Sequence, residues 1–211
     1  MKKKFLSLMM AAAMVATTSV SAFADNYSWS ENEEKDAKVT ITGDVTSIGG
    51  ETVSGTLSVS IPTATKFTVS EEGKVTAPEI KVQNRGTQAV DVYAYKFVDQ
   101  TPNKGSEITV VGAQELKTAQ HTDMLSLRLS GSLGKAYLKS ESSESSGNGV
   151  YTDPDCGTAS TGSGEKLISV SVGDSESITL IGETNSQGST APDKAVQDNF
   201  VLTLKIKKAE S

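Results

Sequence analysis

The chain has 211 residues and a net charge of −6 at pH 7, from 26 acidic and 20 basic residues. An acidic surface repels phosphate backbones, so no nucleic-acid partner is expected. One cysteine and one histidine are too few for an intramolecular disulfide or a structural zinc site, and the length fits a single domain with a substantial core.

The first 24 residues have the pattern of a secretory signal peptide. Three lysines, at positions 2 to 4, precede an apolar stretch from Phe5 to about Val15, and Ala22-Phe23-Ala24 is the small-x-small pattern that signal peptidase recognises. The apolar stretch is shorter than the ~20 residues of a spanning helix, which disfavours a membrane anchor. We therefore expect a secreted, extracellular or cell-surface protein with no membrane span in the mature chain. The short, lysine-rich signal is typical of a Gram-positive bacterium.

Residues 25–37 are polar and acidic, which predicts a flexible leader ahead of the folded domain. Its aromatic residues, Tyr27 and Trp29, are candidates for docking on the domain or on a partner. Removing the three lysines of the signal peptide leaves 17 basic residues against 26 acidic ones, so the mature chain carries a net charge of −9.

From Val39 onward, apolar residues recur at every second position, which is typical of half-buried strands. The clearest alternation runs from 53 to 61, and Pro62 ends it because proline cannot donate to a sheet. Further strands are expected at 67–69 and 80–82. Turn signals follow them at Glu71-Glu72-Gly73 and Asn84-Arg85-Gly86.

The stretch 90–98 is apolar on both faces, which indicates a central strand or one whose aromatic face is covered. The period-two pattern places its aromatic residues on one face: Tyr93, Tyr95 and Phe97. Two interpretations stay open. The three rings belong to the core, or they form an exposed platform on which sugars stack.

The second half of the chain adds short strands and two polar connections. Strands are expected at 108–111, 124–130 and 135–138, with at most one helical turn in 113–123. Residues 139–165 are dominated by Ser, Gly, Asp and Glu, a composition that predicts a long disordered-type loop. Alternation returns at 168–172, 178–180 and 200–206.

About nine to eleven strands with frequent turns predict an all-β fold, an antiparallel β-sandwich of jelly-roll or Ig-like type, as one domain over residues 38–211. Strands from the two ends of the chain are expected to pair in one sheet. Truncation of the last strand would then open the core.

Catalytic residues do not form a recognisable constellation. His121 and Cys156 lie in separate polar segments, and no Gly-x-Ser-x-Gly elbow precedes a helix. Asp153 and Asp155 offer calcium two side chains where six to eight oxygen ligands are needed. We therefore expect no enzymatic activity, no cofactor and no metal site. Cys156 is interpreted as an incidental loop residue, with an intermolecular disulfide as the alternative.

Two stretches carry a family resemblance. The stretch 77–95, APEIKVQNRGTQAVDVYAY, resembles the strand–Asn-x-Gly–strand element of TasA/camelysin-type biofilm fibre proteins. The stretch 199–209, NFVLTLKIKKA, resembles the last strand of WxL surface domains, although Trp29 is followed by Ser30 and Glu31 and no Trp-x-Leu motif is present. The resemblance implies a firmicute secreted cell-surface β-sandwich protein.

These observations predict a non-catalytic protein of the cell surface or the extracellular matrix, with a role in biofilm or adhesion. It would associate with itself by strand addition, using a terminal strand or the leader around Tyr27 and Trp29, or adhere to a cell-wall or extracellular polysaccharide. The alternative is a carbohydrate-binding module that uses the face of Tyr93, Tyr95 and Phe97, with Trp29 as a further candidate.

Overall fold

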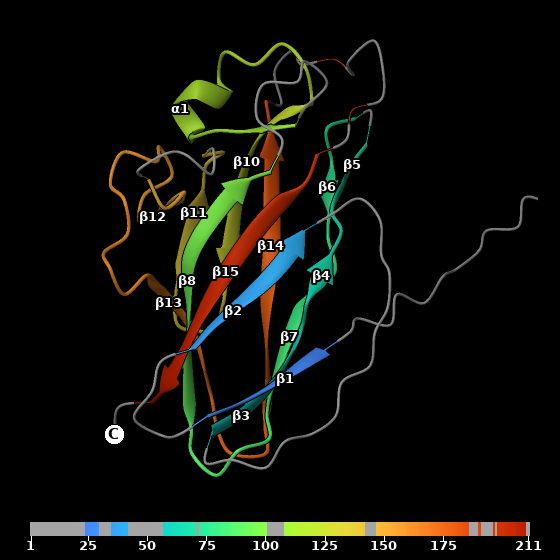
Figure 1. The fold of residues 1–211 in the computed structure, drawn as a ribbon. Helices are drawn as coiled ribbons and strands as arrows, with labels where there is room; N and C mark the ends of the chain where they lie inside the picture. Colours follow the sequence, from blue (N-terminus) through green and yellow to red (C-terminus); the bar gives the residue numbers. More distant parts are fainter. Residues whose placement is uncertain are drawn as a thin grey trace, which may run out of the picture.

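A computed structural model describes residues 24–29, 35–41, 57–70, 72–100, 108–141, 147–185, 190, 196 and 198–209. Within 24–41 the description is limited to the backbone. Residues 1–23, almost all of the predicted signal peptide, lie outside the described part. The described chain forms two sheets, a small hairpin and one short helix (Figure 1), which confirms the all-β class and the predominance of antiparallel pairing.

The larger sheet has eight strands. In spatial order they are β1 (Ala24–Trp29), β3 (Leu57–Pro62), β7 (Ile80–Asn84), β14 (Ser175–Thr184), β10 (Met124–Ser130), β11 (Lys135–Leu138) and β12 (Val150–Tyr151), with β9 (Thr109–Val110) beside β10. All these pairs are antiparallel except β9 with β10.

The second sheet has five strands, and Figure 1 shows two of them, β15 and β2, crossing in front of β14 of the larger sheet. Its order is β13 (Glu165–Val170), β8 (Val90–Asp99), β15 (Phe200–Lys208), β2 (Lys35–Ile41) and β4 (Ala64–Thr65). A separate hairpin joins β5 (Thr68–Val69) to β6 (Val75–Thr76), and α1 (Ala113–Leu116) is the predicted helical turn.

The main core draws its side chains from both sheets, one face of each. The alternation seen in the sequence explains this, because every second residue of β10 from Leu125 to Leu129, and of β15 from Phe200 to Ile206, is apolar and fully buried. Phe200 stacks on Phe97 at a ring-centroid distance of 5.1 Å and on Phe67 at 6.2 Å. These contacts tie β15 to β8 and to the segment leading into β5.

The two sheets are joined along their borders. On one side the chain runs from β3 through Thr63 directly into β4, which belongs to the other sheet. On the other side Phe97 N donates to Asn148 O at 2.7 Å, and Leu133 N donates to Leu167 O at 2.9 Å. These bonds attach the β11–β12 end of the larger sheet to β8 and β13. A strand near the C-terminal end, β15, pairs with β2, as the sequence predicts.

Two composition-based predictions differ from the structure. The leader at 25–37 is predicted to be flexible, yet it contributes β1 and the start of β2, because β3 and β15 offer backbone partners that composition does not reveal. In the loop predicted at 139–165, the described residues 147–165 are fastened by β12 and by the Asp153 side chain, while 142–146 lie outside the described part. The described part of the chain contains fifteen strands, compared with the nine to eleven predicted, because several of them are only two residues long.

Candidate functional site

The three aromatic residues of β8 do not share a face. Tyr95 and Lys96 together occupy an irregularity in the pairing with β15, where the register shifts between Thr203 and Leu204. An extra residue in one strand reverses the alternation beyond it. Phe97 therefore points into the core and is fully buried, whereas Tyr93 and Tyr95 remain half-buried on the outer face. The prediction that the three rings share one face is therefore wrong for Phe97.

Lysines surround the two outer tyrosines. The Nζ atom of Lys205 lies 3.9 Å from the ring centroid of Tyr95, and that of Lys207 lies 5.6 Å from the ring centroid of Tyr93. The registers pair Tyr93 with Lys205 on one side and with Lys166 on the other. Cation–π contact of this kind holds an ammonium group over a ring and covers that ring's face.

A salt bridge anchors the same region. Lys166 Nζ lies 2.6 Å from Asp91 Oδ2, and the Asp91 side chain is 3% exposed, while that of Lys166 is 40% exposed. The other carboxylate oxygen, Asp91 Oδ1, is buried without a hydrogen-bond partner. Lys166 therefore compensates the charge of Asp91, as a buried carboxylate requires, and Lys207 lies opposite Asp91 on β15.

The candidate residues of the leader lie in β1. The register with β3 places Tyr27 opposite Val59 and Trp29 opposite Leu57. Both partners on β3 are fully buried core residues. The structure thus pairs the backbone of this part of the leader with β3 of the domain.

The predicted turn at 84–86 owes its shape to a buried side chain. Asn84 Nδ2 donates to Gln88 O at 2.7 Å and to Val170 O at 3.0 Å, and Asn84 Oδ1 accepts from Gly86 N at 2.9 Å. The first and third bonds fold the β7–β8 turn, and the second ties it to β13 in the other sheet. Asn84 therefore has a structural role in the segment that carries the fibre-protein resemblance.

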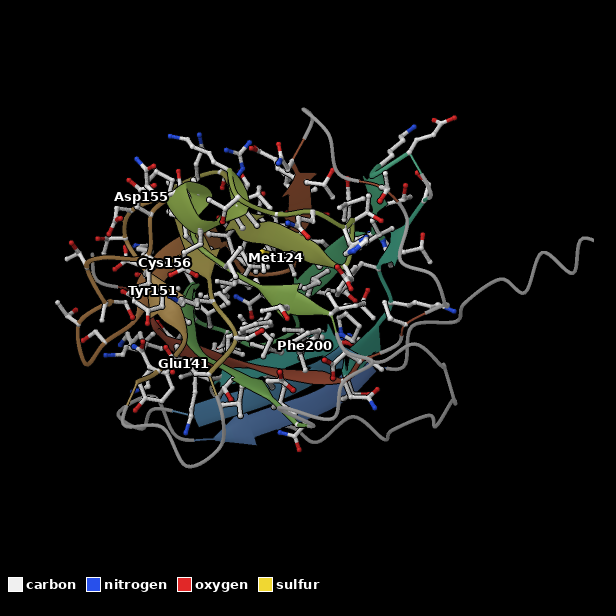
Figure 2. All side chains as sticks on the ribbon, turned by 90° about the horizontal axis from the view of Figure 1, so that it is seen from above. Met124, Glu141, Tyr151, Asp155, Cys156 and Phe200 are labelled. Carbon is white, nitrogen blue, oxygen red and sulfur yellow. The ribbon has the colours of Figure 1, made fainter. Side chains whose placement is uncertain are left out.

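A polar cluster lies on the side of the molecule that carries β11 and β12, where Figure 2 labels Glu141, Tyr151, Asp155 and Cys156. Tyr151 OH donates to Glu141 Oε1 at 2.8 Å, and burial, with this bond, raises the pKa of Tyr151 to about 12. Burial raises the pKa of the Cys156 thiol to about 11, and its Sγ lies 3.8 Å from Leu138 O. A thiol in this state is a poor nucleophile.

The loop before Cys156 is shaped by the Asp153 carboxylate. It accepts backbone N–H groups from Asp155, Gly157 and Thr158 at 3.1, 3.2 and 2.7 Å. The bonds from Gly157 and Thr158 are the main cause of the lowered pKa of Asp153. The carboxylate oxygens of Asp153 therefore stabilise the conformation of the loop to which Asp153 belongs.

The other chemistry-bearing residues stay apart. His121 is exposed, and its Nδ1 lies 3.3 Å from Thr190 Oγ1, whereas Cys156 contacts Leu138. Over the described ranges, no group of three or more His, Cys, Asp or Glu side chains could hold a metal ion. A helix with the length and apolar character needed to cross a membrane is likewise missing from the described part of the chain.

No protein-family model matches the chain, and no curated protein or solved structure shows significant similarity to it. Within the described residues, the geometry offers two candidate sites, the β1 end of the larger sheet and the outer face of the five-stranded sheet.

Proposed function

We propose that this chain is a secreted, non-catalytic β-sandwich protein of the cell surface or extracellular matrix, and that its copies associate by strand addition at β1. The sandwich is supported by a single main core cluster to which both sheets contribute. Secretion is supported by the signal-peptide pattern of residues 1–24. The observation that carries self-association is the position of β1 at the end of the larger sheet.

An edge strand presents backbone N–H and C=O groups on the side away from its partner, and these groups can pair with a strand from another chain. The opposite end of the same sheet is attached to the second sheet through Asn148 and Phe97. The start of β13 is covered by the turn that contains Leu133, and β4 continues from β3. Of the described sheet borders, β1 is therefore the one that favours strand addition.

The location of β1 links it to export. Ala24, the last residue of the predicted signal peptide, is the first residue of β1 and lies opposite Pro62. Cleavage after Ala24 makes Asp25 the first residue of the mature chain, so the mature chain begins within the edge strand. On this proposal, the cleavage that completes export also produces the end of the assembling strand.

The alternative function, carbohydrate binding by aromatic stacking, has less support. Phe97 belongs to the core, where it stacks on Phe200. One face of the Tyr95 ring is occupied by the ammonium group of Lys205. Sugar stacking needs open ring faces, so this surface suits charge recognition better than stacking.

Proline substitutions in β1 test strand addition. Successive N–H groups of a strand point to opposite sides, so one of Asn26→Pro and Tyr27→Pro removes a donor toward β3, and the other removes a donor on the opposite side. Residues 25–211 should form polymers detectable by light scattering and electron microscopy. The proline variant that keeps the wild-type Tm should lose them.

Asn26→Ser, which keeps every backbone donor, is the matched control and should assemble normally. Strand addition at β1 is refuted if residues 25–211 stay monomeric at high concentration. It is also refuted if both proline variants assemble like the wild type.

A further inference from the structure

The outer face of the five-stranded sheet carries a group of lysines around two tyrosines. Alternation and register place them together on β8, β13 and β15, and we call them the lysine–tyrosine face: Tyr93, Tyr95, Lys96, Lys166, Lys205 and Lys207. Lys96 belongs to it because it lies opposite Thr203, which sits between two inward-facing leucines of β15.

The charge of this face is opposite to that of the whole chain. On the described strands β8, β13 and β15, the carboxylate that shares this outer face is that of Asp91, which is buried, bound by Lys166 and opposite Lys207. The other two carboxylates of these strands, those of Glu165 and Asp99, lie opposite the inward-facing residues Ala94 and Phe200. On β2, Asp36 lies opposite Lys205 and Lys38 lies opposite Thr203, so the neighbouring strand adds one charge of each sign. A positive face on an acidic protein is a site of charge complementarity.

The lysines are held at defined positions. Lys205 and Lys207 are two residues apart on β15, which separates them by about 7 Å along the strand. Each lies over a tyrosine ring, and Lys166 is fixed by its 2.6 Å contact with Asp91. Side chains already ordered in the free protein lose less conformational entropy on binding, so this array suits a ligand with regularly spaced charges.

We propose that the lysine–tyrosine face binds a linear polyol phosphate polymer with one phosphodiester per repeat. Lysine is a point charge that suits a phosphate, whereas planar carboxylates favour the guanidinium fork of arginine, and the face contains no arginine. Duplex DNA carries a negative charge about every 1.7 Å of its axis, whereas the proposed polymer carries one per repeat. The acidic remainder of the chain therefore repels DNA more strongly than it repels the proposed polymer.

The proposed ligand site is separate from the edge used for strand addition. The lysine–tyrosine face belongs to the five-stranded sheet, whereas β1 belongs to the larger one. The inference therefore adds a partner to the proposed function and does not depend on assembly. The β1 proline variant that no longer assembles should bind the polymer as the wild type does.

Binding of residues 25–211 to poly(glycerol phosphate), followed by titration calorimetry at low ionic strength, tests the proposal. Replacing Lys205 and Lys207 together by Gln should weaken binding about tenfold, because two charge contacts are lost. The matched control replaces Lys81 and Lys135, exposed lysines of the larger sheet, by Gln and should change the affinity less than about twofold. The affinity should also fall as salt is added.

Charge-conserving replacement of Lys205 and Lys207 by Arg should retain the binding that the Gln variant loses, which separates loss of charge from loss of fold. If the Gln variant has a lower Tm than the wild type, Lys207→Gln alone takes its place, since Lys207 has the longer ring contact. The proposal is overturned by absence of binding, by equal weakening in both Gln pairs, or by tighter binding of DNA or a polyuronate.

Discussion

The Cys156 thiol shows how one buried group makes stability depend on pH. Burial raises its pKa from 9.0 to about 11, so the folded chain holds this proton more tightly than the unfolded chain. The stabilising contribution is complete below pH 9 and is lost as the pH rises through about 11. At pH 8 the native thiol should react with a disulfide reagent at least about tenfold more slowly than the thiol of the urea-unfolded chain.

Absorbance of the released reagent gives both rates, and Cys156→Ala supplies the blank. The same comparison decides between the two interpretations of this cysteine. A native thiol as reactive as the unfolded one, or a disulfide-linked dimer that forms readily in air, would contradict burial and favour the intermolecular disulfide. Cys156 also has a left-handed backbone, φ 54°, so Cys156→Gly should fold well.

At the scale of single elements, β8 shows where sequence periodicity stops being informative. The alternation correctly places Val90, Val92 and Ala94 inward. Beyond Ala94 it puts Phe97 outward, because the register shift at Tyr95 and Lys96 arises from pairing with β15 and has no local sequence signal. Of the three predicted aromatic residues, only Phe97 is therefore misassigned. The lysines of β13 and β15 that lie beside Tyr93 and Tyr95 are not part of the predicted site, because only strand pairing brings them there.

The join between β12 and β8 depends on Gly149. It adopts φ +68°, and a Cβ atom there would collide with the carbonyl oxygen of Phe97. Both the left-handed backbone and the close approach disfavour any larger residue. Gly149→Ala should lower the free energy of unfolding by about 2–4 kcal/mol, measured by urea denaturation.

Gly162→Ala is the matched control for this substitution. An added Cβ at Gly162 meets nothing within 4 Å, and its φ lies outside the left-handed region. The control should change the free energy of unfolding by less than about 0.5 kcal/mol. Equal effects of the two substitutions would mean that the β12–β8 join does not stabilise the fold.

For the whole molecule, the sequence predicts the class but not the connections. Alternating apolar residues are enough to place the buried faces of β10 and β15, because burial follows period two. The strand at 24–29 and the start of the strand at 35–41 are hidden in a polar, acidic composition, and their partners lie far along the chain. Non-local pairing of this kind overrides local propensity, so the edge that carries the proposed function is seen only in the fold.

The last strand unites the fold, and its removal gives the strongest prediction about the whole molecule. β15 lies between β8 and β2, and its inward side chains, Phe200, Leu202, Leu204 and Ile206, are fully buried. Burial of each contributes about 1.5–3 kcal/mol. Their sum is comparable to the ~5–15 kcal/mol that stabilises an average domain. The chain 25–199 should therefore be unfolded by circular dichroism.

Single substitutions in the full-length chain distinguish the effect of lost core packing from the effect of shortening the chain. Leu204→Thr puts a hydroxyl into the core and should cost about 2–4 kcal/mol, whereas Val201→Thr, on the half-buried outer side of the same strand, should cost less than about 1 kcal/mol. A cooperative thermal transition in the chain 25–199 would show that the core closes without β15. In that case the pairing of β15 with β2 would not be required for the domain to fold.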